Sequence, residues 1–293
     1  MKFIEKNPII MIVVGVLGIS LSSIFVKFST APSAVTAAYR LLWTVLILTP
    51  VVFSKKESRQ ELKNLPKKSL VLSIISGAFL ALHFVLWFES LSHTTVASST
   101  TIVCTEVIWV ALGYLFVLKG RLSPFAILAI LITLGGSVLI AYSDSSGQSG
   151  LYGDILALLA ALAVAVYTLI GGILREKTST TVYTYVVYLS CAFVLLVTCL
   201  VQRHNLFAFG FSAPLVGLLL SLFSTILGHS IFSWCLRYFS PAFVSASKLC
   251  EPVVSAIIAA FIFSEIPTLL QIIGAVLVIG GVLFYSLIEK KRQ

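Results

Sequence analysis

Charged residues are scarce in this sequence. Asp, Glu, Lys and Arg together make up 11% of the 293 residues, and hydrophobic residues make up 59%. Soluble domains carry about 25% charged residues. With a mean hydropathy of +1.07, the chain cannot cover a water-facing surface, so we expect lipid to surround it. The predicted fold class is all-α, because helices satisfy their own backbone polar groups in lipid.

Sequence motifs of enzymes and pumps are also missing. Neither H-E-x-x-H nor G-x-S-x-G occurs, so a membrane-embedded enzyme is not expected. The nucleotide-binding pattern G-x-x-x-x-G-K-[ST] is absent, which argues against ATP-driven pumping. There is no C-x-x-C, and all five cysteines lie in apolar runs, where we predict small buried side chains rather than disulfides. No metal or cofactor is expected.

Ten apolar runs of roughly membrane-spanning length make up most of the chain. The first is long enough to be a permanent helix rather than a cleaved signal peptide. Short polar segments rich in Pro, Ser and Gly separate the runs. We predict a polytopic membrane protein with transmembrane helices over 8–28, 34–53, 69–90, 94–118, 124–142, 151–172, 180–201, 212–236, 241–263 and 268–288.

The same landmarks occur twice. Glu106 lies 29 residues before the pair Gly135-Gly136, and Glu251 lies 29 residues before Gly280-Gly281. The offset of 145 is close to half of the chain, so each copy holds five spans. An odd number of spans makes the second copy enter from the opposite side, which is the inverted repeat of secondary transporters. The predicted domains are 1–147 and 148–293. The glycines are predicted to allow close helix packing.

Basic residues gather on one side of the predicted topology. Arg203 is the one basic residue in the external loops, and sixteen lie in the segments that a cytoplasmic N-terminus assigns to the cytoplasm. We therefore expect a multi-pass protein of the cell (inner) membrane with both termini in the cytoplasm. The net charge of +9 reflects this bias and is no evidence for nucleic-acid binding. The sixteen are Lys2, Lys6, Lys55, Lys56, Arg59, Lys63, Lys67, Lys68, Lys119, Arg121, Arg175, Lys177, Arg237, Lys290, Lys291 and Arg292.

Five charged residues interrupt the apolar runs, where each costs roughly 2.5–3.5 kcal/mol on insertion scales. Glu106 either lines a substrate path or is a neutral group bonded to a neighbouring helix. Glu251 and Lys248 share a helix face, so they form either a substrate-binding or proton-exchanging pair or a structural ion pair. Arg40 stays charged and needs an anion or carbonyl. Lys27 is predicted to reach the membrane interface.

Aromatic residues and histidines repeat across the halves. His83 and His229 lie 146 residues apart, and Trp87 and Trp234 follow them by four and five positions. Together with Tyr167, these side chains either line a central pocket or pack within the helix bundle. No cysteine or carboxylate cluster accompanies the histidines, so zinc is not expected.

These features together resemble the EamA-like branch of the drug/metabolite transporter superfamily. The resemblance covers both halves and rests on three segments: Pro32 to Arg40, Leu249 to Glu265 (with Glu251-Pro-Val), and Gln271-Ile-Ile-Gly to Val282. The first half departs from it, because Val107 stands at the position of Pro252 and Gly120 at that of Glu265. The resemblance implies ten helices, a cavity formed by spans 1–4 and 6–9, and spans 5 and 10 at the periphery, where a homodimer contact would lie.

The predicted function is secondary active export of small polar metabolites such as amino acids, by alternating access around a midplane cavity. The predicted substrate-binding residues are Arg40, His83, Trp87, Glu106, Tyr167, His229, Trp234, Lys248 and Glu251. A facilitative channel or uniporter is the alternative, with a membrane-embedded enzyme as a remote third. Proton coupling stays open against uniport and exchange.

Overall fold

The computed structural model describes residues 8–26, 28–94, 96–144, 150–254, 257–258 and 268–290, and regular structure in these ranges is helical throughout. The predicted all-α class is therefore confirmed. Lys27, the turn at 145–147 and Glu265 lie outside the described residues. The helices are α2 (Pro8–Ser20), α3 (Ser22–Val26), α4 (Ser33–Ser54), α5 (Lys56–Lys63), α6 (Lys67–His93), α7 (Val96–Cys104), α8 (Glu106–Phe116), α9 (Pro124–Asp144), α10 (Leu151–Leu174), α11 (Thr180–Val201), α12 (Ser212–Leu219), the π-helix η1 (Leu220–His229), α13 (Ser230–Cys235), α14 (Pro241–Lys248) and α16 (Leu269–Lys290).

Eight helices in the described residues are long and apolar enough to cross a membrane, where the sequence predicted ten. The span expected at 124–142 forms α9, whose apolar stretch is shorter, Pro124–Ile140. The span expected at 241–263 lies partly outside the described residues. The eight are Pro8–Val26, Ser33–Ser54, Lys67–His93, Ser99–Phe116, Leu151–Leu174, Thr180–Val201, Ser212–Cys235 and Leu269–Glu289.

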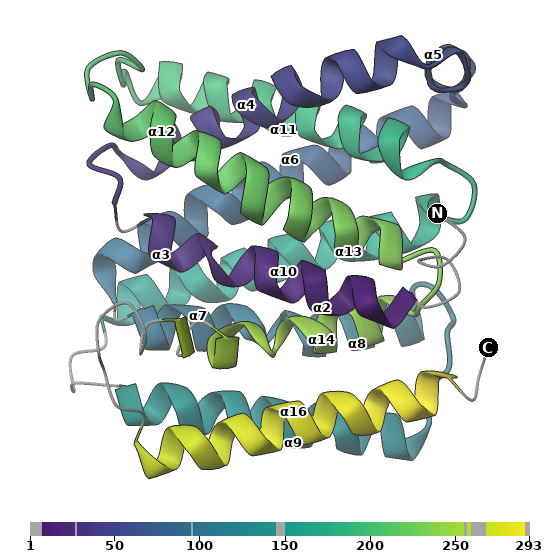
Figure 1. Cartoon of the computed structure of the whole chain (residues 1–293), viewed down its shortest axis with the longest axis vertical. Coiled ribbons are helices and arrows are strands. Elements are labelled where there is room, and N and C mark those ends of the chain that lie inside the picture. Colours follow the sequence, from purple (N-terminus) through teal and green to yellow (C-terminus); the bar gives the residue numbers. More distant parts are fainter. Residues whose placement is uncertain are drawn as a thin grey trace.

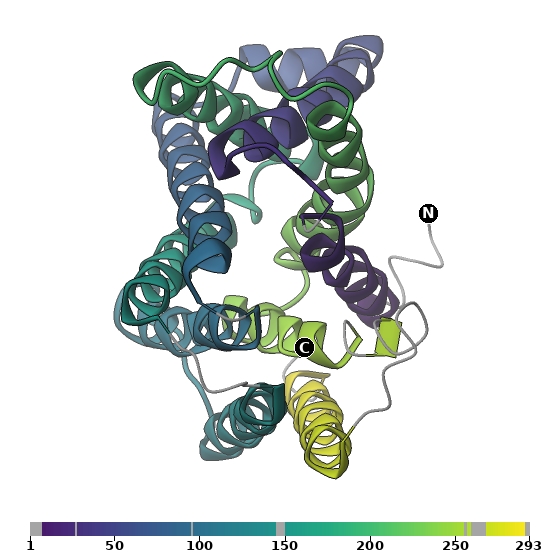
Figure 2. The same cartoon turned by 90° about the vertical axis from the view of Figure 1, so that its left-hand side faces the viewer.

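The long helices run from side to side, across the longest axis of the molecule (Figure 1), and the α9–α16 pair lies at one edge (Figure 2). Glycines allow this pair to approach closely. A Cβ added at Gly136 would lie 2.7 Å from the carbonyl oxygen of Gly274, and one added at Gly281 would lie 2.2 Å from the Thr133 hydroxyl oxygen. Gly135 and Gly280 face open space. In each glycine pair the second residue, Gly136 or Gly281, is thus the one that contacts the facing helix.

Both helices that carry the repeated glutamates are broken at the glutamate. Thr105 separates α7 from α8, and its N–H bonds to the Ile102 carbonyl three residues back at 3.0 Å. Leu249 and Cys250 separate α14 from the helical residues that begin at Glu251, again with N–H groups bonded three residues back. The break therefore does not need a proline. Glu106 and Glu251 each begin a helical segment, where its positive dipole end favours a carboxylate.

The run Ser212–Cys235 contains a second irregularity. Residues Leu220–His229 form a π-helix, and the Ser230 N–H bonds to the Thr225 carbonyl five residues back. Such segments are rare and often lie at functional sites. A Cβ added at Gly18 of α2 would lie 2.8 Å from the carbonyl oxygen of Phe223, so the glycine allows backbone contact here. This packing places η1 beside α2 in the bundle interior.

Candidate functional site

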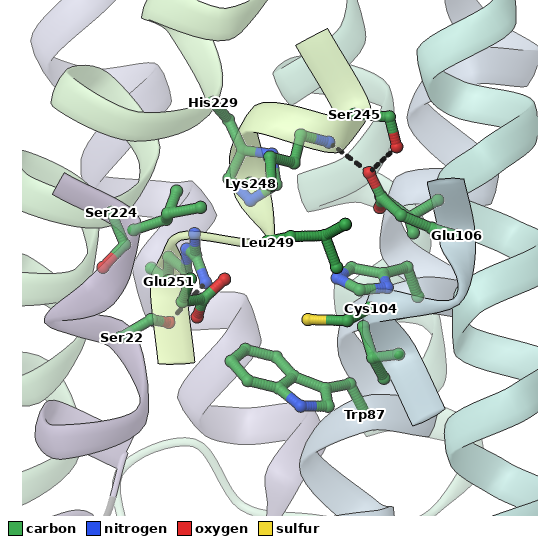
Figure 3. Close-up of a pocket in the computed structure, with 15 residues that line it drawn as sticks. Ser22, Trp87, Cys104, Glu106, Ser224, His229, Ser245, Lys248, Leu249 and Glu251 are labelled. Carbon is green, nitrogen blue, oxygen red and sulfur yellow. Dashed lines mark hydrogen bonds and ion pairs between the residues drawn. The ribbon is translucent and has the colours of Figure 1, made fainter. Parts of the chain in front are cut away.

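A cavity in the bundle interior collects most of the ionisable side chains that interrupt the apolar helices. Its empty volume is about 560 Å³, which includes the space at its open mouth. Figure 3 shows Glu106 and Ser245 on one side, with Glu251 and Ser22 on the other. Of the nine residues predicted from the sequence, those that line it are Arg40, His83, Trp87, Glu106, His229, Lys248 and Glu251.

Glu106 is held by two donors from α14. The Lys248 ammonium lies 2.9 Å from Oε1 of Glu106, and the Ser245 hydroxyl donates to the same oxygen at 2.7 Å. The Lys248 ammonium also lies 3.5 Å from the Thr168 hydroxyl. The Glu106 carboxyl is buried, with 5% of the residue exposed. Glu106 and Lys248 thus form an ion pair that joins α8 to α14.

The expected pair of Lys248 with Glu251 is wrong. It assumed one continuous helix, in which residues three apart share a face. The helix is broken at Leu249 and Cys250, so this spacing does not apply. In the described residues no cationic nitrogen lies within 4 Å of the Glu251 carboxylate. Glu251 lines the cavity, and no cation on the described part of its own helix lies close enough to its carboxylate to form an ion pair.

Arg40 is 1% exposed, and the groups that accept its hydrogen bonds are neutral. Its Nε donates to the Thr225 hydroxyl of η1 at 2.7 Å, and Nη1 donates to the Ser22 hydroxyl at 3.5 Å. The guanidinium lies 4.2 Å from the centre of the Phe84 ring. Nη2 has no hydrogen-bond partner in the described part of the chain. A buried cation with an unused donor favours an anionic ligand, because an unpaired buried charge is costly.

The two histidines belong to one aromatic wall. His83 Nδ1 lies 3.0 Å from the Ala160 carbonyl, and since a carbonyl only accepts, Nδ1 carries the proton. The His83 ring stacks on Trp87 at 5.9 Å and 13°. His229 meets Phe84 edge to face, with ring centres 5.4 Å apart, and its Nδ1 has no partner among the described residues. The wall therefore presents ring edges and one unused ring nitrogen.

Tyr167 and Trp234 are not among the cavity-lining residues. Tyr167 lies behind the wall, with its ring 6.0 Å from that of His229 and its hydroxyl 2.9 Å from that of Ser233. Trp234 instead packs on Tyr238, with ring centres 4.4 Å apart. The spacing explains the difference. Trp87 follows His83 by four positions and shares its face, whereas Trp234 follows His229 by five and does not.

Comparison with known proteins identifies the class to which this arrangement belongs. The model of the EamA-like transporter family matches residues 6–142 and again residues 151–287. The chain belongs to the EamA-like transporter family. It is thus a multi-pass membrane transporter, and the predicted family resemblance is confirmed.

One relative of this EamA-like protein carries a transporter name, and one solved structure shares its fold. An "Uncharacterized transporter" of Clostridium kluyveri (strain ATCC 8527 / DSM 555 / NBRC 12016 / NCIMB 10680 / K1) is 23% identical over 211 residues, which cover 70% of this chain and 68% of the relative. A crystal structure of another protein has the same fold, with a TM-score of 0.80 and 16% identity. That match covers 98% of this chain and 99% of the other.

Several hydroxyl groups in or beside this cavity were not predicted from the sequence. Ser22, Ser224 and Ser245 line it, and Thr225 holds Arg40 from behind. Serine and threonine are common in transmembrane helices, where they bond to their own backbone, as the Ser20 hydroxyl does to the Val16 carbonyl. Composition alone does not distinguish those that face a cavity. In the described residues no group of three His, Cys, Asp or Glu side chains is placed to hold a metal.

Proposed function

We propose that this EamA-like transporter is a secondary active exporter of small zwitterionic metabolites, such as amino acids. The observation that carries the proposal is the charge arrangement in the cavity. Arg40 and Glu251 line one cavity and neither is neutralised by a close ionic partner in the described residues. Glu106 and Lys248 neutralise each other. A ligand with one carboxylate and one ammonium group supplies what Arg40 and Glu251 lack.

In this proposal, the substrate carboxylate binds the Arg40 guanidinium, whose fork of donors suits a carboxylate. The substrate ammonium binds the Glu251 carboxylate. Trp87 and His83 contact the rest of the molecule. Glu106 and Lys248 hold α8 against α14 and keep the cavity walls in register. The absence of a close Arg40–Glu251 ion pair supports this division, because a preformed pair would compete with the substrate.

We further propose ten spans in two inverted five-helix repeats, 1–147 and 148–293, with both termini in the cytoplasm. The helix breaks at Thr105 and at Leu249–Cys250 support the repeat, since they stand at related places in the two halves. Broken helices near the midplane are typical of the substrate sites of secondary transporters. Rocking of the two halves around this site would expose it to one side of the membrane at a time.

The experiment is counterflow in proteoliposomes that hold purified protein. Vesicles preloaded with unlabelled leucine, or another member of an amino-acid panel, should accumulate the labelled form. Glu251→Gln and Arg40→Lys should each reduce the rate more than tenfold, because each loses more than about 1.4 kcal/mol of substrate interaction. The matched control is Glu89→Gln, which removes an exposed carboxylate from α6. Normal counterflow by both cavity variants would overturn the assignment of Arg40 and Glu251.

The direction of transport and its coupling to protons are tested in separate experiments. Inside-out vesicles should accumulate substrate if the protein exports it, and an imposed pH gradient should change that accumulation if protons are coupled. A channel is the second candidate. Channel flux would rise linearly with concentration and would show no counterflow, whereas carrier flux saturates. Net uptake by right-side-out vesicles under a proton gradient would contradict export.

A further inference from the structure

A buried arginine that is not among the cavity-lining residues joins three helix ends. Arg175 follows the last residue of α10 and is 1% exposed. Its Nε donates to the Ser233 carbonyl of α13 at 2.9 Å, and Nη2 donates to the Thr180 hydroxyl of α11 at 2.6 Å. Nη1 donates to the Thr178 carbonyl. One side chain thus ties the end of α10 and the start of α11 to α13.

All of these acceptors are neutral. In the described residues no carboxylate oxygen lies within 4 Å of the Arg175 nitrogens. Burial, helped by nearby Arg237, lowers the pKa of Arg175 to about 10, so the group stays charged at neutral pH. A guanidinium held by two carbonyls and a hydroxyl leaves no unpaired carboxylate behind when it moves into water. Opening therefore breaks three hydrogen bonds to a charged group but leaves no buried charge without its partner, which suits a part that must release once in every transport cycle.

The same contact is linked to the cavity wall. Ser233 offers its carbonyl to Arg175, and its hydroxyl lies 2.9 Å from that of Tyr167. The Tyr167 ring meets the ring of cavity-lining His229 at 6.0 Å and 66°. Between the cavity and Ser233 runs η1, whose Thr225 holds Arg40. A movement of η1 on substrate binding would thus reach Ser233 through covalent and hydrogen-bonded neighbours.

A second contact holds the loop between α10 and α11 in place. Oε1 of Glu61, on α5, accepts the Ser179 N–H at 2.6 Å. Ser179 caps α11 and stands between Thr178 and Thr180, both of which bond to Arg175. The α10–α11 loop is therefore held from two sides, by Arg175 and by α5.

We propose that Arg175, Ser233 and Tyr167 form the cytoplasmic gate of the transporter. The closed state of this gate is the one in which Arg175 donates to the Ser233 carbonyl, and Arg175 must leave Ser233 before the cavity can open to the cytoplasm. Arg175 is a positioning residue, since it acts through Ser233. The inference rests on the proposed alternating access and on the orientation given above, but not on the identity of the cargo.

The test uses Cys104, which lines the cavity, as a reporter. In full-length protein with the other four cysteines replaced by alanine, a membrane-impermeant maleimide is applied from either side, using inside-out and right-side-out vesicles. Arg175→Gln and Arg175→Lys should raise labelling from the cytoplasmic side about tenfold, the shift expected from losing about 1.4 kcal/mol of the closed state. Lys177→Gln is the control, because it removes an exposed charge from the same loop and should change labelling little.

Unchanged cytoplasmic labelling in well-folded Arg175 variants would overturn the gate. If those variants do not fold, Glu61→Gln and Thr180→Val weaken the same loop at its surface, and unchanged labelling in both has the same meaning. Equal labelling from both sides in the unaltered protein would count against alternating access itself. Because labelling needs no substrate, this experiment still tests the gate if the protein proves not to transport amino acids. A purely structural role for Arg175 would lower stability without changing the side from which Cys104 is reached.

Discussion

The ammonium nitrogen of Lys248 lies 2.9 Å from the Oε1 carboxylate oxygen of Glu106, a residue 142 positions earlier in the chain. This pair decides the charge balance of the cavity. Lys248 is used by Glu106 and is not available to Glu251, three residues further on. The cavity therefore holds one satisfied pair together with an arginine and a glutamate, Arg40 and Glu251, that have no close ionic partner in the described residues.

Breaking the Glu106–Lys248 pair from one side should be worse than removing both charges. Glu106→Gln or Lys248→Met alone leaves one buried charge without its partner, and each should lower the free energy of unfolding by about 3–5 kcal/mol. The double variant should recover a large part of that loss. Thermal unfolding in detergent, followed by tryptophan fluorescence, gives the three values. Strictly additive losses would show that the two residues do not act as a pair.

Loss of the hydroxyl that holds Arg40 should weaken the protein measurably. Thr225→Val keeps the shape of the side chain but removes the acceptor of Arg40 Nε, with an expected cost of about 1–3 kcal/mol in unfolding free energy. Thr198→Val is the control, because within the described residues that hydroxyl bonds only the Val194 carbonyl of its own helix. Chemical denaturation in mixed micelles compares the two. Equal losses would mean that the bond to Arg40 has no special role.

Neighbouring glycines of α9 should respond differently to alanine. At Gly136 the new Cβ would meet the Gly274 carbonyl at 2.7 Å, so Gly136→Ala should destabilise by about 1–3 kcal/mol through overpacking. At Gly135 nothing lies within 4 Å, and alanine should be neutral or should stabilise by up to about 1 kcal/mol. Unfolding temperatures of the two variants test this contrast. The α9–α16 contact would need revision if Gly135→Ala proved the more harmful change.

Reporter fusions should reveal the topology. A fluorescent protein fused after Gln293 should fluoresce, and alkaline phosphatase inserted beside Arg203 should be active, because the basic loops favour the cytoplasm. Phosphatase inserted at Arg59, within the basic loop, should be inactive and serves as the control. Phosphatase activity at Arg59 together with inactivity at Arg203 would reverse the proposed orientation.

The local sequence predicted a helical membrane protein and the positions of most of its helices. Apolar runs of membrane-spanning length predict helices in lipid whatever their neighbours are, since the backbone must satisfy itself there. Charged residues such as Arg40 and Glu106 are costly in that setting, so their presence alone indicated where function is concentrated. Seven of the nine predicted site residues line one cavity, and four of these seven are the charged residues Arg40, Glu106, Lys248 and Glu251.

The sequence by itself determined a helical membrane protein and its small set of costly polar groups, because these depend on composition and spacing along the chain. Tertiary structure decided which groups meet. Lys248 pairs with Glu106 and not Glu251, because the helix breaks between them and α8 lies closer. Arg175 meets the Ser233 carbonyl, 58 residues further along the chain, through packing between segments far apart in sequence. No local pattern contains those distances.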